Sequence, residues 1–270
     1  MEYVKNINEI KNLKNNKIEG KPNLVNSTIS FKGNNNILIC EPNVKIVNSN
    51  LSFMGNNSII YLSDSKSDYV VTLVLYNDST MYFGKNNVMY SPFNVVCQEA
   101  QNFIMGDECI IFSGVNIRTS DAHPIYDGNS KKRINFSQSV FIGDHVWIGQ
   151  LTYISRGVKI GSGSIIGNTS FLPPLFEVSS NCYGFGNPFK IVNKNVFFTK
   201  DFVGNFKSDD TLNFSSYKSD VFLYNFVNKE TLNLNEIDRI IKSLIVEERL
   251  HFIKELFVKN KRKNRFTIGY

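Results

Sequence analysis

An isoleucine recurs every sixth residue in one stretch of the chain, and this spacing limits what the chain can fold into. The five positions are Ile142, Ile148, Ile154, Ile160 and Ile166, and glycine follows all of them except Ile154. A helix would scatter a six-residue repeat around its axis, and an ordinary strand repeats every two residues. A period of six fits a three-sided prism in which each hexapeptide forms one side, which is a parallel β-helix.

A longer, looser repeat precedes the isoleucine stretch. Residues 27–38 match residues 49–60 at an offset of 22, and both contain the sequence Gly-Asn-Asn. Glycine and asparagine tolerate the left-handed backbone angles that tight corners need. One coil cannot bury its own inner face, so stacked coils would build one continuous core. We therefore expect irregular coils of the same β-helix here.

The sequence divides into three parts. We expect an N-terminal segment at 1–24, the β-helix at 25–195 and a C-terminal extension at 196–270. Residues 234–259 of the extension have apolar side chains at helical spacing, with acidic residues near the start and lysines near the end, as the helix dipole favours. This amphipathic helix would pack against the prism or join neighbouring subunits. The fold class predicted is all-β with an α-helical appendage.

A polar stretch interrupts the coils at 119–135. It contains the run DAHPIYDGNSKKRIN at 121–135, which is rich in proline, glycine, asparagine and charge. Such composition is typical of a loop. Loops that leave a rigid scaffold commonly carry binding and catalytic residues.

Composition excludes several classes of protein. No apolar run is long enough to span a membrane and the N-terminus has no apolar signal core, so the expected location is the cytoplasm. The formal net charge of +6 favours anionic partners, but no nucleic-acid-binding motif is present. A lysine-rich composition gives the same charge without any function. The basic run 259–265 would be a solvated end or a peripheral contact with the inner membrane surface.

The cysteines and histidines give no sign of a metal site. The four cysteines lack paired spacing, which favours buried reduced thiols over a disulfide or a metal. They are Cys40, Cys97, Cys109 and Cys182. Three histidines and scattered carboxylates do not form a ligand pattern, so we expect no metal.

Three motifs carry a resemblance to a known family. They are RTSDAHPIY at 118–126, IGDHVWIG at 142–149 and GFGNPFK at 184–190. Together with the coils, they resemble the hexapeptide-repeat acyltransferases, and most of all the sialic acid and polysialic acid O-acetyltransferases of bacterial capsules and lipooligosaccharides. The resemblance covers residues 25–195. It implies a left-handed β-helix, acetyl-CoA as the donor and a homotrimer.

The resemblance also implies catalytic residues. It places the general base at His123, whose neutral imidazole would take the proton of a sugar hydroxyl, an effect typically worth about 10²–10⁴-fold. A surface histidine without a role is the alternative. Asp121 would orient the imidazole or merely start a turn. Trp147 would wall the thioester arm and donate its N–H to developing charge, or pack on a neighbouring subunit. His145, at a corner, is expected to be exposed.

The resemblance places coenzyme A along the coils beyond Trp147. Main-chain groups of two residues there would bond its amides, and Lys190 would meet its phosphates. The coil residues expected to line the coenzyme are Gly149, Gln150, Gly167 and Asn168. Arg156 could help, although a solvated arginine is the plainer expectation. Phe189 and the run 171–174 depart from the family pattern and leave the nucleotide contacts open.

The loop bears on the acceptor. Lys131, Lys132 and Arg133 favour an acidic acceptor, with a solvated loop as the equal alternative. The sequence thus predicts an acetyl-CoA-dependent O-acetyltransferase that acts on a sialic acid-containing surface glycan by direct transfer in a ternary complex. The alternatives are a neutral sugar, amino sugar or nucleotide sugar as acceptor, and a non-catalytic β-helix with a structural or glycan-binding role.

Overall fold

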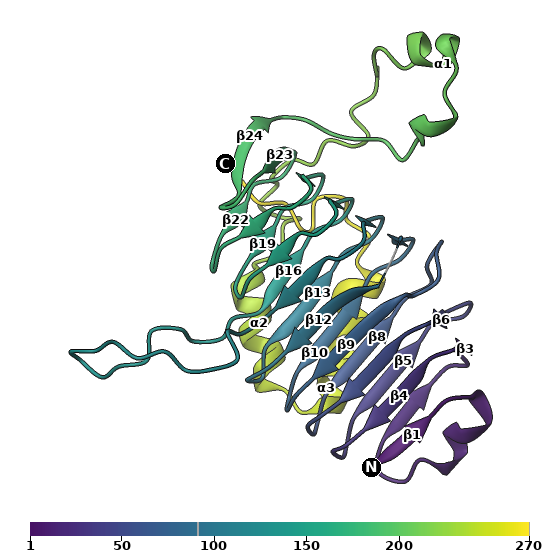
Figure 1. Cartoon of the computed structure of the whole chain (residues 1–270), viewed down its shortest axis with the longest axis vertical. Coiled ribbons are helices and arrows are strands. Elements are labelled where there is room, and N and C mark those ends of the chain that lie inside the picture. Colours follow the sequence, from purple (N-terminus) through teal and green to yellow (C-terminus); the bar gives the residue numbers. More distant parts are fainter. Residues whose placement is uncertain (91, 270) are drawn as a thin grey trace.

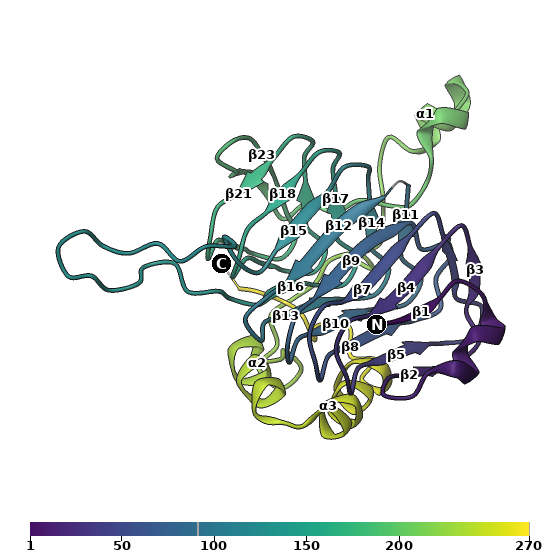
Figure 2. The ribbon, with the colours of Figure 1, turned by 60° about the horizontal axis from the view of Figure 1, so that its bottom comes forward.

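The computed structural model describes residues 1–90 and 92–269, and in them the chain winds as a prism with three sheets as its sides (Figures 1 and 2). The first sheet contains β1 (Glu2–Val4), β4 (Thr28–Phe31), β7 (Asn50–Phe53), β9 (Val71–Leu75), β12 (Phe93–Cys97), β15 (Asn116–Arg118), β18 (Tyr153–Ile154) and β21 (Phe171–Leu172). The second contains β2 (Lys17–Glu19), β5 (Ile37–Cys40), β8 (Ile59–Leu62), β10 (Thr80–Phe83), β13 (Asn102–Met105), β16 (Val140–Ile142), β19 (Lys159–Ile160) and β22 (Glu177–Val178).

The third side of the prism has shorter strands. Its main sheet contains β11 (Val88–Met89), β14 (Ile110–Ile111), β17 (Trp147–Ile148), β20 (Ile165–Ile166), β23 (Cys182–Phe185) and β24 (Lys190–Lys194), and a separate pair is formed by β3 (Asn23–Val25) and β6 (Lys45–Val47). The strand pairs are parallel except at the two ends, where β1 pairs with β4 and β23 with β24 in antiparallel fashion. The predicted all-β fold class is confirmed.

The isoleucine ladder forms the core of the last coils. Ile142 pairs with Ile160 in the second sheet, Ile148 with Ile166 in the third, and Ile154 with Leu172 in the first. Each of these side chains is at most 1% exposed. One coil therefore takes 18 residues here, whereas β4 and β7 pair at an offset of 22 residues.

The glycines of the ladder are explained by the next coil rather than by a bend. A Cβ added at Gly143 would lie 2.6 Å from the Ser162 nitrogen, and one at Gly149 would lie 2.6 Å from the Asn168 nitrogen. Neither glycine has a positive φ among the described residues. Close approach of the neighbouring corner thus excludes any side chain at these positions.

The stack starts earlier than residue 25, the boundary expected from the sequence. β2 already pairs with β5 in the second sheet, and β3 pairs with β6. Ile10 and Leu13, from and just after the 3₁₀ helix η1 (Ile7–Asn12), pack against the core at this end. The N-terminal residues are therefore the first coil and its cover, because they close the open end of the core.

The C-terminal helices cover the outer face of the second sheet (Figure 2). They are α2 (Leu234–Ser243), α3 (Val246–Ile253) and a π-helical turn η3 (Lys254–Lys259), preceded in the extension by η2 (Val203–Asn205) and α1 (Ser208–Asn213). Ile237, Ile241 and Phe257 join one apolar cluster with Tyr82 and Phe141 of the sheet. The single helix expected at 234–259 is thus two helices and a turn, with a break at Leu244, whose backbone is extended.

Arg265 ties the C-terminal tail to the corner between the second and third sheets. Its guanidinium donates to both oxygens of Asp144, at 2.9 and 2.7 Å, and lies 3.0 Å from Asp107. Its side chain is 2% exposed, so this residue of the basic run 259–265 is not solvated as expected, whereas Lys259, Lys261, Arg262 and Lys263 are exposed. Lys261 also pairs with Asp107, at 3.5 Å, but from an exposed position.

We predict that Arg265→Ala lowers the free energy of unfolding by about 3–5 kcal/mol, because removing one partner of a buried ion pair leaves Asp144 uncompensated. Chemical denaturation followed by circular dichroism measures this. Lys261→Ala is the matched control and should change the same quantity by less than about 1 kcal/mol. Equal losses in the two variants would contradict the account.

Candidate active site

The excursion loop leaves the prism at the edge between the first and second sheets, after β15 and before β16 (Figure 1). Its two arms pair: the Ile134 N–H donates to the Ile125 carbonyl at 2.9 Å, and the Asp127 N–H donates to the Lys132 carbonyl at 2.9 Å. The loop is therefore an extended hairpin. His123 lies near its root and is exposed.

Two ion pairs pin the loop root to the coils on either side. Arg133 donates to both oxygens of Glu99 in the preceding coil, at 2.7 and 2.8 Å. Arg156 in the following coil donates to Asp121 at 2.9 Å. The hydrogen bonds from Arg133 and then from Ser137 lower the pKa of Glu99 to about 2, so this anchor stays ionised at neutral pH.

Asn135 joins the loop strands behind His123. Its amide nitrogen donates to Asp121 at 3.0 Å and to the His123 carbonyl at 2.9 Å, while its oxygen accepts from the Ile125 N–H at 2.7 Å. Asn135 is 3% exposed. Two of these bonds hold the backbone that carries the His123 ring, and the third holds the Asp121 carboxylate beside it.

Among the described residues, no hydrogen bond joins the Asp121 carboxylate to the His123 ring, and its oxygen accepts from other side chains. Burial raises the pKa of its carboxyl group, but hydrogen bonds from Arg156 and Asn135 outweigh burial and lower it. The carboxylate is thus engaged with these two side chains, and its main-chain oxygen accepts from the His123 N–H at 2.9 Å. Arg156 is not the solvated arginine expected, because its side chain is 12% exposed and ion-paired.

The three basic side chains of the loop differ in how far they are already bonded within the chain. Arg133 is committed to Glu99, so its charge holds the loop rather than facing solvent. Lys131 donates to the Gly128 carbonyl at 2.7 Å and Lys132 is exposed at the turn. Of the three basic residues in the loop, Lys131 and Lys132 are therefore the ones without an ion pair among the described residues.

Trp147 lies on the outer face of the third sheet. In register with it are Ile110 in the preceding coil and, in the following coils, Ile165 and Tyr183. Trp147, Ile165 and Tyr183, with Gly167 and Asn168, line a groove of about 360 Å³. The ring of Phe112 is 6.0 Å from Trp147 and that of Phe198 is 5.7 Å from it. An apolar wall with few polar groups is typical of a small-molecule site.

The predicted coenzyme residues divide into two groups. Trp147, Gly167 and Asn168 line the groove, whereas Gly149 and Gln150 lie at the adjoining corner. The Gln150 N–H donates to the Asn168 side chain at 2.8 Å, so this donor, expected to bond the coenzyme, already joins two coils. Lys190 opens β24 with an exposed side chain and does not line the groove.

The packing of Phe189 explains why this position departs from the family pattern. It is 2% exposed and packs edge-on against Phe176 at 5.6 Å. It belongs to the prism core at the C-terminal end. The large ring thus closes the last coil, because no further coil covers it.

His145 is buried, contrary to the exposed corner position expected for it. Its ring stacks on Phe198 at 4.0 Å and on Phe222 at 4.7 Å, and its Nε2 bonds the Phe198 carbonyl at 2.9 Å. Burial is the main cause that lowers the pKa of His145. The repeat pattern alone does not predict this contact, because Phe198 comes from beyond the repeats. The apolar residues at 197–198 and 222–224 were the available signal.

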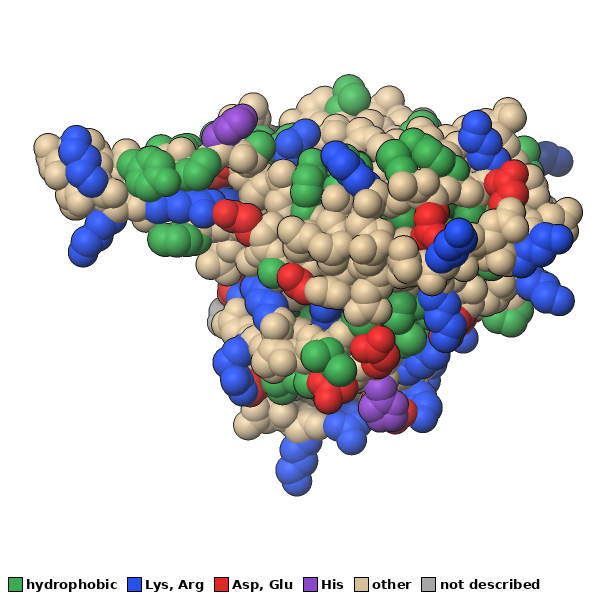
Figure 3. Space-filling view, turned by 90° about the horizontal axis from the view of Figure 1, so that it is seen from below, with side chains coloured by type: hydrophobic (Ala, Val, Ile, Leu, Met, Phe, Trp, Pro, Cys, Tyr) green, Lys and Arg blue, Asp and Glu red, His purple; other side chains and the backbone are tan. Residues whose placement is uncertain are grey.

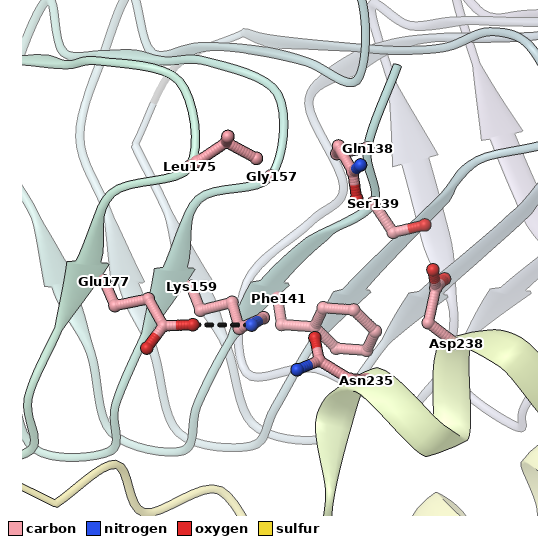
Figure 4. Close-up of a pocket in the computed structure, with 9 residues that line it drawn as sticks. All are labelled: Gln138, Ser139, Phe141, Gly157, Lys159, Leu175, Glu177, Asn235 and Asp238. Carbon is pink, nitrogen blue, oxygen red and sulfur yellow. Dashed lines mark hydrogen bonds and ion pairs between the residues drawn. The ribbon is translucent and has the colours of Figure 1, made fainter. Parts of the chain in front are cut away.

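A second, polar pocket of about 200 Å³ lies between the second sheet and α2 (Figure 4). Its charges are paired: Lys159 with Glu177 at 2.5 Å, and Asp238 with Lys242 at 2.5 Å. The groove at Trp147 is the better candidate for a ligand. It is larger than the polar pocket, and no ion pair occupies its apolar lining. Across the residues that the structure describes, no group of three His, Cys, Asp or Glu side chains could hold a metal, and no helix is long and apolar enough to cross a membrane.

All four cysteines are buried, and none of them forms a disulfide. Burial raises the pKa of the Cys40 and Cys97 thiols, and that of Cys109 to about 12. They are therefore neutral core residues, as the sequence predicts.

The structure does not bring His123 and Trp147 together in one chain. The loop leaves the edge shared by the first and second sheets, and the third sheet, which carries Trp147, does not reach that edge. The ribbon shows the loop projecting away from β17 (Figure 2).

Comparison with known proteins identifies relatives of this chain. The family model described as bacterial transferase hexapeptide (six repeats) matches residues 139–174. The polysialic acid O-acetyltransferase of Escherichia coli O1:K1 is 36% identical over 148 residues, which are 55% of this chain and 46% of that protein. The polysialic acid O-acetyltransferase of Neisseria meningitidis is 32% identical over 135 residues, 50% of this chain and 62% of that protein. The chain thus spans about half to three-fifths of these curated relatives.

Two solved structures match over more of their length. The polySia-specific acetyltransferase NeuO is 33% identical with a TM-score of 0.63, covering 74% of this chain and 92% of that one. The polysialic acid O-acetyltransferase OatWY is 28% identical with a TM-score of 0.62, covering 74% and 95%. The stacked hexapeptide coils of this chain thus have the fold of the hexapeptide transferases. This chain belongs to the hexapeptide-repeat acetyltransferase family, in the branch that includes the polysialic acid O-acetyltransferases.

We predict that acidification destabilises the protein through His145. Its pKa is lowered from 6.5 in the folded state, so below that pH the unfolded chain binds the proton more readily and stability falls. The melting temperature should drop between about pH 7.5 and about pH 5.5, and His145→Phe should reduce the drop. His251→Phe, at an exposed site on α3, is the control and should keep the wild-type slope. An unchanged slope in His145→Phe would refute the assignment.

Proposed function

We propose that the protein is an O-acetyltransferase that moves an acetyl group from acetyl-CoA to a hydroxyl group of a sialic acid-containing surface glycan. The observation that carries this proposal is the rigid presentation of His123 on a loop pinned by Glu99 and Arg156. The likeness to NeuO and OatWY, both named as polysialic acid acetyltransferases, supports the acceptor.

The reaction we propose is a direct transfer with His123 as the general base. An unshared nitrogen pair of the neutral imidazole takes the hydroxyl proton while the hydroxyl oxygen attacks the thioester carbonyl. The tetrahedral intermediate then expels the coenzyme thiolate, which receives the proton from the imidazolium. No acetyl group is attached to the enzyme. The raised thiol pKa values of the buried cysteines fit a mechanism without a cysteine nucleophile.

The groove beside Trp147 is where we place the acetyl-CoA arm. Trp147, Ile165 and Tyr183 offer an apolar wall, and Asn168 adds a polar side chain. The indole N–H could donate to the carbonyl oxygen as charge develops on it. Lys190, exposed beyond the groove, remains our candidate for the nucleotide phosphates.

The separation of His123 from Trp147 supports a shared active site. Since one chain holds them on different sides of the prism, a loop from one copy must reach the groove of the next. A contact of this head-to-tail kind closes into a ring when the rotation allows it. We therefore propose a homotrimer with one site at each interface.

For location, we propose the cytoplasm. The basic run 259–265 is a poor candidate for a contact with the inner membrane surface. Arg265 is buried, Lys261 pairs with Asp107, and Lys263 donates to the Asp220 carbonyl at 3.2 Å.

We predict that wild-type protein releases free thiol from acetyl-CoA in the presence of polysialic acid, and that His123→Ala lowers kcat by about 10²–10⁴-fold. His251→Ala is the control and should keep wild-type turnover. If His123→Ala keeps more than about a tenth of the activity, the general-base role is wrong. If thiol is released only with neutral sugars, the proposed acidic acceptor is wrong, but the proposed acetyltransferase activity stands.

We predict that the double variant Lys131→Gln, Lys132→Gln raises KM for polysialic acid about threefold to tenfold and leaves KM for acetyl-CoA unchanged, because two cations near the acceptor are lost. Added salt should raise the wild-type KM more than that of the variant, since it screens the same attraction. Lys17→Gln, on the first coil, also removes one lysine charge and is the control for each of the two loop substitutions. An unchanged acceptor KM would place the acceptor elsewhere.

A further inference from the structure

Residues 201–221 leave the body of the protein and return to it, and we call this segment the arm (Figures 1 and 2). Both of its ends are fixed beside Trp147. On the entering side, Phe198 contacts the Trp147 ring and Lys200 forms an ion pair of 2.5 Å with Glu108. On the returning side, Phe222 stacks on His145. The arm therefore starts and ends at the side of the prism that carries the groove.

The arm exposes large apolar side chains. Phe202 is 68% exposed, and Val203 and Leu212 are each 70% exposed. A cluster of this kind on a short segment is unusual for a surface that stays in water and marks a contact surface.

The excursion loop exposes apolar side chains as well. Ile125 and Tyr126, two and three residues after His123, are 50% and 59% exposed, and Ile134 and Phe136 on the opposite strand are 62% and 60% exposed. Figure 3 shows the projecting loop with hydrophobic and basic side chains on one face. Within a single chain the loop and the arm lie at different edges of the prism, so neither covers the other.

We infer that the arm of one copy packs on the excursion loop of its neighbour and holds that neighbour's His123 at the groove. This inference rests on the proposed shared active site. A neighbour that brings His123 to Trp147 also brings Ile125 and Tyr126 to the place where the arm begins. Each apolar surface then finds a partner, and the catalytic loop is clamped between groove and arm.

Charge favours this partner over a lipid surface. The arm contains four aspartates and two lysines, whereas the loop at 119–135 contains three basic and two acidic residues. The two segments therefore attract one another. A net negative arm, with Asp209 and Asp210 in the first turn of α1, would be repelled by an anionic membrane.

Cross-linking tests the contact directly. We expect the double variant Tyr126→Cys, Val203→Cys to form covalent dimers and trimers with a short bismaleimide, because Val203 lies where the arm begins and is 70% exposed. Mixed copies that carry one cysteine each should form only dimers. The native cysteines are buried and should not react. A matched control moves the second cysteine to Lys17 on the first coil and should not cross-link.

Kinetics test the clamp. The triple variant Phe202→Ser, Val203→Ser, Leu212→Ser should lower kcat/KM about tenfold with an unchanged melting temperature, because these side chains are exposed within the chain. If the protein has transferase activity that depends on His123 but no cross-link forms, the arm contact is wrong and the proposed function stands. A cross-link in a protein without transferase activity would support the contact and overturn the proposed function. Loss of binding to anionic vesicles in the triple variant, without any cross-link, would overturn the inference in favour of a lipid surface.

Discussion

A coil of this prism can bury its inner side chains only against the coils before and after it. That requirement fixes the register of every strand, since Ile142, Ile148 and Ile154 each meet an apolar partner one coil later. It also brings neighbouring corners so close that Gly143 and Gly149 have no room for a side chain. Insertions are tolerated only at the edges, where the chain turns. The excursion loop and the groove therefore lie on different sides of a rigid body.

The six-residue period was enough to predict the stack and the buried isoleucines, and the composition of 121–135 was enough to predict the loop, because these follow from local sequence alone. It could not predict contacts that join the repeats to the C-terminal extension. His145 and Arg265 have ordinary sequence surroundings, yet one is stacked between Phe198 and Phe222 and the other neutralises Asp144, which is 121 residues away. The roles of Arg156 and Asn135 were equally hidden, since they depend on which corner lies beside the loop.

The extension thus does more than cover one sheet. Its helices bury the outer face of the second sheet, its tail holds the corner beside β17 through Arg265, and its arm starts beside Phe198, whose ring contacts Trp147. The loop and the arm are joined to their own chain by ion pairs at their bases, and they expose apolar side chains where they project. This division fits a body that is complete alone and an active site that is completed by a neighbour.

The central claim is that His123 and Trp147 act across two copies. Mixing His123→Ala copies with Trp147→Ala copies, after dissociation and reassembly, tests it most directly. Each variant alone should be nearly inactive. If one copy supplies the loop and the next the groove, about a quarter of the interfaces in an equal mixture pair two intact halves, and activity should return to about that fraction. A mixture as inactive as its components would contradict the shared site.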